Sequence, residues 1–127
     1  MGTFTHKLVL YGASSNGSQR PSAGLDALVD TGALFSSVSA EILEDLGVKP
    51  TRKVPVRFAN GTVEQWPIGE VEAELDGVRM PILCFFGAAG APPILGTHAL
   101  EAFLLTVDPV EMKLVPREAF LMSARLS

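Results

Sequence analysis

The sequence has very little cysteine and few basic residues. Cys84 is the only cysteine among 127 residues, so an intrachain disulfide and a cysteine-rich zinc site are both excluded. Ten Lys and Arg residues face fourteen Asp and Glu, which gives a formal net charge of -4 without any Lys/Arg run. Because binding to a phosphate backbone needs a basic patch, we expect no nucleic-acid partner.

The chain also lacks the patterns of a leader or a membrane span. Residues 1–10 show no charged segment followed by an apolar one, as a signal peptide would. The most apolar stretch, 80–96, is interrupted by residues that break a helix: Pro81, Gly87, Gly90, Pro92, Pro93 and Gly96. We therefore expect a buried strand and loop there, no membrane partner, and a soluble, cytoplasmic protein.

The length of the chain and the spacing of its glycine, proline and apolar residues predict one all-β domain. Domains commonly have about 100–150 residues, so we expect a single domain over 1–127, with a core of about 3–116 and an ambiguous tail at 117–127. Glycine and proline separate short apolar runs, which is typical of β proteins. Strands are predicted at 3–11, 25–29, 54–58, 66–75, 78–86, 104–107 and 112–115, and an exposed loop at 13–24.

Short local signals predict two helices and two hairpins. Residues 39–46 form the first expected helix, with Ser39 as its N-cap and Gly47 just beyond its end. Residues 98–103 form the second, with Thr97 as a possible N-cap. Asn60-Gly61 and Asp76-Gly77 predict hairpin turns, the first of type I′. Trp66, in the strand after the first turn, could line a pocket or fill the core, and we expect the core.

The chemistry of the chain is concentrated at Asp30-Thr31-Gly32-Ala33, directly after the apolar Leu28-Val29. Alone, Asp-Thr-Gly is a weak signal, because an aspartate often caps a turn. Its context is more specific. A short helix, a glycine-tipped hairpin and a second hairpin follow, and then Ile94-Leu95-Gly96 leads into another helix.

In this order and spacing, the chain resembles the retropepsin-like aspartic proteases, including their bacterial relatives. The resemblance covers about 25–116 and is carried by Ala27–Ala33, Phe58–Thr62, Pro93–Thr97 and Leu105–Asp108. It implies a closed acid-protease barrel with one or two short helices, assembled as a two-fold homodimer that cleaves a peptide or protein substrate without cofactor or metal. It also implies one catalytic residue, Asp30, and support of its loop by Thr31, Gly32 and Ala33. Ala59, Asn60 and Gly61 would form the tip of a substrate-covering flap, and Ile94, Leu95 and Gly96 would support the catalytic loop from beneath.

The expected chemistry needs two carboxylates around one water. When two carboxylates lie within about 3 Å, they share a single proton, so that one acts as base and the other as acid. Asp30 is the only aspartate followed by Thr-Gly, and Ile-Leu-Gly occurs once, so the sequence encodes half of such a site. A homodimer would complete it. The alternatives are a catalytically silent peptide-binding or dimerisation domain on the same fold, and a β-barrel interaction module with accidental motifs.

Overall fold

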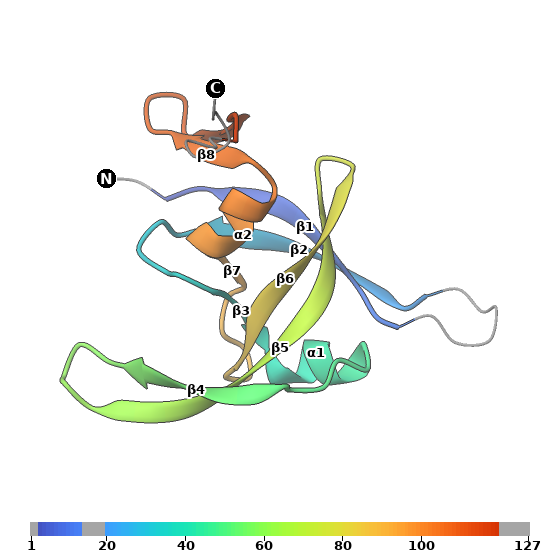
Figure 1. Ribbon diagram of the computed structural model, residues 1–127, viewed down its shortest axis with the longest axis vertical. Coiled ribbons are helices and arrows are strands. Elements are labelled where there is room, and N and C mark those ends of the chain that lie inside the picture. The colour runs from blue at the N-terminus through green and yellow to red at the C-terminus, as the bar shows by residue number, and fades with distance from the viewer. Residues whose placement is uncertain (1–2, 14–19, 120–127) are drawn as a thin grey trace, which may run out of the picture.

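The computed structural model describes residues 3–13 and 20–119, and within these ranges the chain is built mainly of β-strands (Figure 1). The elements, in chain order, are β1 Thr5–Tyr11, β2 Ser22–Val29, β3 Ser36–Ser39, α1 Ala40–Asp45, β4 Arg52–Arg57, β5 Val63–Leu75, β6 Val78–Gly87, β7 Ile94–Leu95, α2 Thr97–Ala102, β8 Leu105–Asp108 and β9 Lys113–Pro116.

The main sheet closes on itself. Its strands follow the order β1-β2-β7-β3-β6-β5-β4, and β1 pairs with β5 as well as with β2. This extra pairing turns six strands into a ring and leaves β4 outside, attached only to β5. The predicted all-β barrel with short helices is therefore confirmed. Closing the barrel removes the free edges that an open sheet would present.

The alternation of apolar and polar residues along the long strands places the apolar side chains in the core. Leu8 and Leu10 of β1 are fully buried, and Val71, Ala73 and Leu75 of β5 point to the same interior. The residues between the latter three are glutamates, which lie on the outer face as the sequence pattern predicted. Apolar side chains are thus removed from water on one face of each strand while the other face stays hydrated.

The helices confirm one predicted cap and correct the other. The hydroxyl of Ser39 accepts a hydrogen bond from the Ile42 amide at 3.5 Å, and Gly47 adopts a φ of 80° after α1. Thr97, however, is the first residue inside α2, and Gly96 is the N-cap without a side-chain hydrogen bond. A contact with a distant segment explains the difference. The amide of Thr97 donates to the Ala33 carbonyl at 2.9 Å, so this loop takes the place of a side-chain cap.

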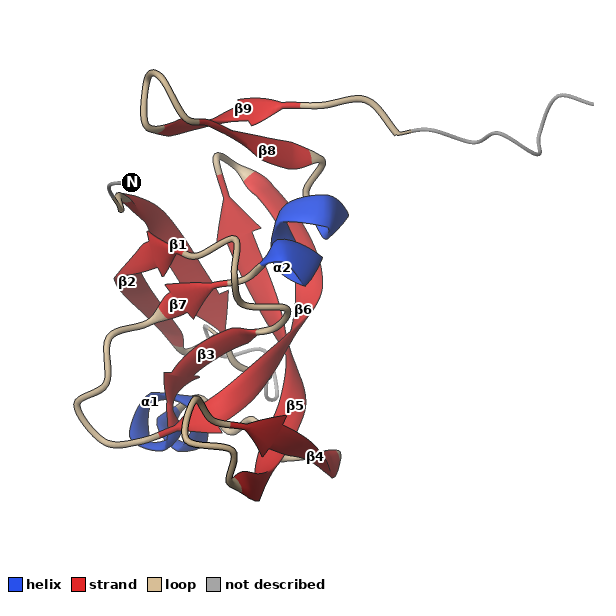
Figure 2. Ribbon diagram, turned by 90° about the vertical axis from the view of Figure 1, so that its left-hand side faces the viewer, coloured by secondary structure: helices blue, strands red, loops and turns tan. Residues whose placement is uncertain are grey.

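Several boundaries differ from the predicted ones. β2 begins at Ser22, inside the segment predicted as a loop, while residues 14–19 of that loop lie outside the described residues. The strands β3 and β7 were not predicted. β8 and β9 form a separate hairpin next to α2 (Figure 2). Residues 117–119 have no regular structure, and the rest of the ambiguous tail is outside the described residues.

Among the described residues, no helix has the length and apolar character needed to cross a membrane.

Candidate active site

Asp30 stands at the end of β2 and is fixed there by the strands on both sides. Val29, just before it, pairs in parallel with Leu95 of β7 and donates its amide to the Phe4 carbonyl at 2.9 Å. The amide of Asp30 donates to the Leu95 carbonyl at 3.1 Å. The backbone that carries the carboxylate is therefore held by hydrogen bonds to two separate segments of the chain.

The loop folds around the Asp30 carboxylate itself. The amide of Gly32 donates to Asp30 Oδ1 at 2.9 Å, and the Ala33 amide donates to the Asp30 carbonyl at 3.1 Å. A Cβ on Gly32 would lie 3.2 Å from Oδ1, a tight contact that glycine avoids. Asp30 is half-buried in the single chain, whereas Thr31 and Gly32 are exposed. The Gly32 amide thus orients the carboxylate at the surface of the barrel, while the Ala33 amide holds the turn of the backbone.

The segment after β7 crosses directly beneath this loop. A Cβ on Gly96 would lie 2.7 Å from the carbonyl carbon and oxygen of Phe35 and 2.9 Å from the Ala33 oxygen, so only glycine allows the two backbones to approach so closely. The Gly96 amide donates at 3.1 Å to the hydroxyl of Ser36, which is fully buried. Ile94, Leu95 and Gly96 therefore lie against β2 and the segment that follows Asp30, and their support of a catalytic loop stays a prediction.

The predicted flap is the β4–β5 hairpin, which projects from the barrel (Figure 1). Its turn is not the predicted type I′. The Gly61 amide donates to the Phe58 carbonyl and the Phe58 amide to the Thr62 carbonyl, both at 2.9 Å, and only Gly61 has a positive φ, of 89°. This is a three-residue loop, a type I turn followed by a glycine bulge. Asn60 does not have a positive φ, and its side chain accepts a hydrogen bond from the Thr62 amide at 3.0 Å.

The three tip residues, Ala59, Asn60 and Gly61, are exposed. No hydrogen bond among the described residues joins them to the loop of Asp30. The hairpin and the loop are instead separated by a cavity, and their predicted cooperation over a substrate stays a prediction.

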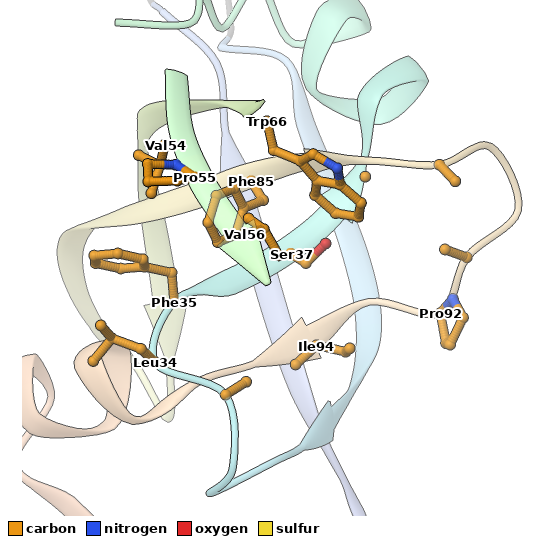
Figure 3. Close-up of a pocket in the computed structure, with 14 residues that line it drawn as sticks. Leu34, Phe35, Ser37, Val54, Pro55, Val56, Trp66, Phe85, Pro92 and Ile94 are labelled. Carbon is orange, nitrogen blue, oxygen red and sulfur yellow. The ribbon is translucent and has the colours of Figure 1, made fainter. Parts of the chain in front are cut away.

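That cavity has a volume of about 500 Å³ (Figure 3). Leu34 and Phe35 line it from the segment after Asp30, Val54 and Val56 from the hairpin, and Trp66 and Phe85 from β5 and β6. Trp66 is half-buried and lies against this cavity, so the favoured core role is wrong and the alternative, a pocket-lining role, is the one observed. Of the lining residues, the sequence pointed to Ala33 and Ile94 as site residues, and the others come from four distant segments and carry no motif that marks them.

The strongest electrostatic perturbations lie away from this loop. Tyr11 donates to Glu74 Oε1 at 2.6 Å, which raises the pKa of the phenol and lowers that of the carboxyl. Burial in the barrel raises the pKa of the Cys84 thiol to about 12. Over residues 3–13 and 20–119, the structure contains no cluster of three or more His, Cys, Asp or Glu side chains arranged to hold a metal ion.

Comparisons with known proteins agree with this geometry. The family model described as "gag-polyprotein putative aspartyl protease" matches residues 22–102. The solved protease of simian foamy virus (mac) is 15% identical, with 78% of this chain and 93% of the viral chain covered at a TM-score of 0.55. The retroviral protease-like domain of Ddi1 from Leishmania major is 18% identical, with 99% of both chains covered at a TM-score of 0.55. A search of curated protein sequences found no significant match.

At these identities the solved structures show a common fold. The family model spans more than half of the chain and includes the Asp30 loop, the hairpin and the crossing at Gly96. The chain therefore belongs to the retropepsin-like aspartic protease family.

Proposed function

We propose that this chain is one subunit of a homodimeric aspartic endopeptidase in which the Asp30 carboxylates of two copies activate one water. The observation that carries the proposal is the Asp30 loop itself. Its carboxylate accepts the Gly32 amide at 2.9 Å and is presented at the surface beside an apolar cavity. Such an arrangement orients a carboxylate toward a reacting group without burying it beyond reach.

The need for a second chain follows from the chemistry of a single carboxylate. Of the five aspartates in the sequence, Asp30 alone precedes Thr-Gly. Asp108, on the neighbouring β8, is already engaged, since its Oδ1 accepts the amides of Val110 and Glu111 at 2.9 and 3.1 Å. An isologous dimer would supply the missing partner as a second copy of the same loop.

Two grooves beside Thr31 support the proposed contact between the two loops. A groove of about 160 Å³ lies on one side of the loop, lined by Phe4, Asp30, Thr31 and Met112 among others. A second groove of about 290 Å³ is lined by Thr31, Thr97 and Arg117 among others. Because Thr31 is exposed between them, a partner loop could dock there and bring its own carboxylate to Asp30.

In the proposed dimer, the two carboxylates share one proton, because both cannot stay ionised at about 3 Å. The ionised carboxylate takes a proton from the water as the water attacks the scissile carbonyl carbon. The protonated one donates its proton to the carbonyl oxygen. The peptide would lie extended between the loop and the β4–β5 hairpin, held by main-chain hydrogen bonds. No metal or cofactor takes part in this scheme.

The test compares Asp30→Asn with Asp26→Asn, a matched change on the exposed outer part of β2. Peptide-library cleavage followed by mass spectrometry should be lost in Asp30→Asn and retained in Asp26→Asn, with equal circular dichroism. Mixing the Asp30→Asn protein with the unmodified one should reduce activity beyond dilution, because mixed dimers hold only one carboxylate. Cleavage that survives Asp30→Asn would remove Asp30 from the mechanism. Selective peptide binding without any cleavage would support the silent domain instead.

A further inference from the structure

Strand β4 forms an open edge of the main sheet. It is the last strand in the order β1-β2-β7-β3-β6-β5-β4 and pairs only with β5. The β4–β5 hairpin also projects from the barrel, and no strand among residues 3–13 and 20–119 covers the side of β4 that faces away from β5 (Figure 1). An open strand edge offers backbone amides and carbonyls with which another extended chain can pair.

The hydrogen-bond pattern of the hairpin determines which backbone groups lie on this free edge. The Phe58 amide donates to the Thr62 carbonyl, and hydrogen-bonded pairs of this kind recur at every second residue of an antiparallel ladder. With the register of this hairpin, the backbone groups of Lys53, Pro55 and Arg57 therefore point away from β5. Since proline has no amide, the edge offers donors at Lys53 and Arg57 and carbonyl acceptors at all three residues.

The same strand is basic, although the protein is acidic. β4 carries Arg52, Lys53 and Arg57 and no Asp or Glu, whereas the whole chain has a net charge of -4. All three cations are exposed, and the ion pairs found over residues 3–13 and 20–119 include none of them. The acid on the facing part of β5, Glu64, instead accepts a hydrogen bond from Trp66 Nε1 at 3.0 Å. The edge therefore presents positive charge that suits a negatively charged partner.

Two of the cations lie on the same face of the hairpin at a fixed interval. Side chains alternate along a strand, so Lys53 and Arg57 share one face, while the half-buried Val54 and Val56 share the other. The two cations are four residues apart, which is about 13 Å at roughly 3.3 Å per residue. A strand added at the free edge would place its own side chains opposite them at the same interval.

We propose that the free edge of β4 binds an extended acidic segment of a partner protein, in which two Asp or Glu residues four positions apart pair with Lys53 and Arg57. Backbone hydrogen bonds align the segment, and the two ion pairs select its sequence. A second copy of this chain does not fit, because two such edges would bring like charges together. The surface lies outside the proposed cleavage site, and the inference does not depend on the proposed endopeptidase function.

The first experiment measures the binding of two labelled peptides to the Asp30→Asn protein, in which the proposed cleavage is removed. The peptides Thr-Glu-Thr-Thr-Thr-Glu-Thr and Thr-Glu-Thr-Thr-Glu-Thr-Thr have the same composition, but only the first places both glutamates on one face of a strand. The first peptide should bind about threefold tighter or more, because it forms one additional ion pair. Its affinity should fall as the NaCl concentration is raised. An oligothymidylate of similar length tests whether any polyanion binds.

Two matched variants and one backbone measurement locate the contact. Lys53→Gln removes one of the two cations, whereas Lys7→Gln removes a cation from an exposed position on β1, inside the barrel sheet. Lys53→Gln should abolish the difference in affinity between the two peptides, and Lys7→Gln should preserve it, with equal thermal unfolding of both variants. When the first peptide is bound, the amides of Lys53 and Arg57 should exchange hydrogen more slowly, because they gain hydrogen bonds to the added strand.

The results that would overturn the proposal are distinct. No binding of the first peptide, equal affinity for both peptides, or a difference that survives Lys53→Gln each overturns it. Oligothymidylate that binds at least as tightly as the first peptide overturns it as well, because the surface would then select for charge alone. Unchanged exchange at Lys53 and Arg57 with the peptide bound overturns the strand pairing. Since the Asp30→Asn protein is used, each result holds whether or not the unmodified protein cleaves peptides.

Discussion

The close approach of the Gly96 backbone to the segment after Asp30 offers the most direct test of how the fold positions the Asp30 loop. Gly96 has a φ of -92° and a ψ of 175°, which any residue can adopt. Gly96→Ala therefore adds no backbone strain of its own. Its effect comes from a Cβ placed 2.7 Å from the carbonyl carbon and oxygen of Phe35, which are rigid backbone atoms.

Overpacking of this kind costs about 1–3 kcal/mol. For a domain of this size, that lowers Tm by roughly 4–12 °C at about 4 °C per kcal/mol. The displaced segment, 33–35, begins three residues after Asp30. A misplacement of about 1 Å in an active site can reduce the rate by roughly 100-fold, so kcat/KM should fall further than stability alone explains.

The matched control is Gly24→Ala. A Cβ on Gly24 meets no heavy atom within 4 Å, and the residue lies in the exposed part of β2. This change should leave stability within about 1 kcal/mol, because alanine restricts the unfolded chain more than glycine does. Thermal unfolding at one protein concentration and kcat/KM with one peptide check both variants. A Gly96→Ala protein as stable and as active as Gly24→Ala would refute the proposed tight crossing.

Two further predictions concern the flap and the buried thiol. Gly61→Val and Gly77→Val each put a β-branched residue at a positive φ, 89° and 82° respectively, with no neighbour within 4 Å. Both should lower the free energy of unfolding by about 1–2 kcal/mol. Only Gly61→Val should also lower kcat/KM. Equal kinetic losses would argue against a role for the tip. Burial holds the pKa of Cys84 at about 12, above its ordinary 9.0, so the stability it contributes is complete below pH 9 and is lost as pH rises toward 12. In denaturant titrations the free energy of unfolding should fall over that pH range. At neutral pH, a thiol reagent should modify Cys84 only when the protein unfolds. Immediate modification of the folded protein would contradict the burial of Cys84.

The parts of the fold that depend on residues close together in the chain could be predicted from the sequence. Ser39 caps α1 through its own hydroxyl, and Asp76-Gly77 forms a two-residue turn with φ values of 52° and 82°. These features depend on residues a few positions apart, so a short window contains the whole signal. The Asp30 motif was found for the same reason.

The parts of the fold that were not predicted depend on contacts between segments that are distant in the chain. β3 consists of serines and one valine, which shows no apolar alternation. It is a strand because it pairs with β6 and because the Ser36 hydroxyl accepts the Gly96 amide. Thr97 was predicted as a cap from its type alone, yet the loop after Asp30 satisfies its amide. In each case, tertiary hydrogen bonds override the local preference.

The proposed dimer makes activity depend on protein concentration. One chain supplies one Asp30 within Asp-Thr-Gly, so the pair of carboxylates exists only while two chains are associated. On dilution below the dissociation constant, specific activity should therefore fall, and sedimentation at the same concentrations should show the dimer giving way to single chains. A strictly monomeric protein that still cleaves peptides would refute the shared pair, because one Asp30 cannot supply both carboxylates.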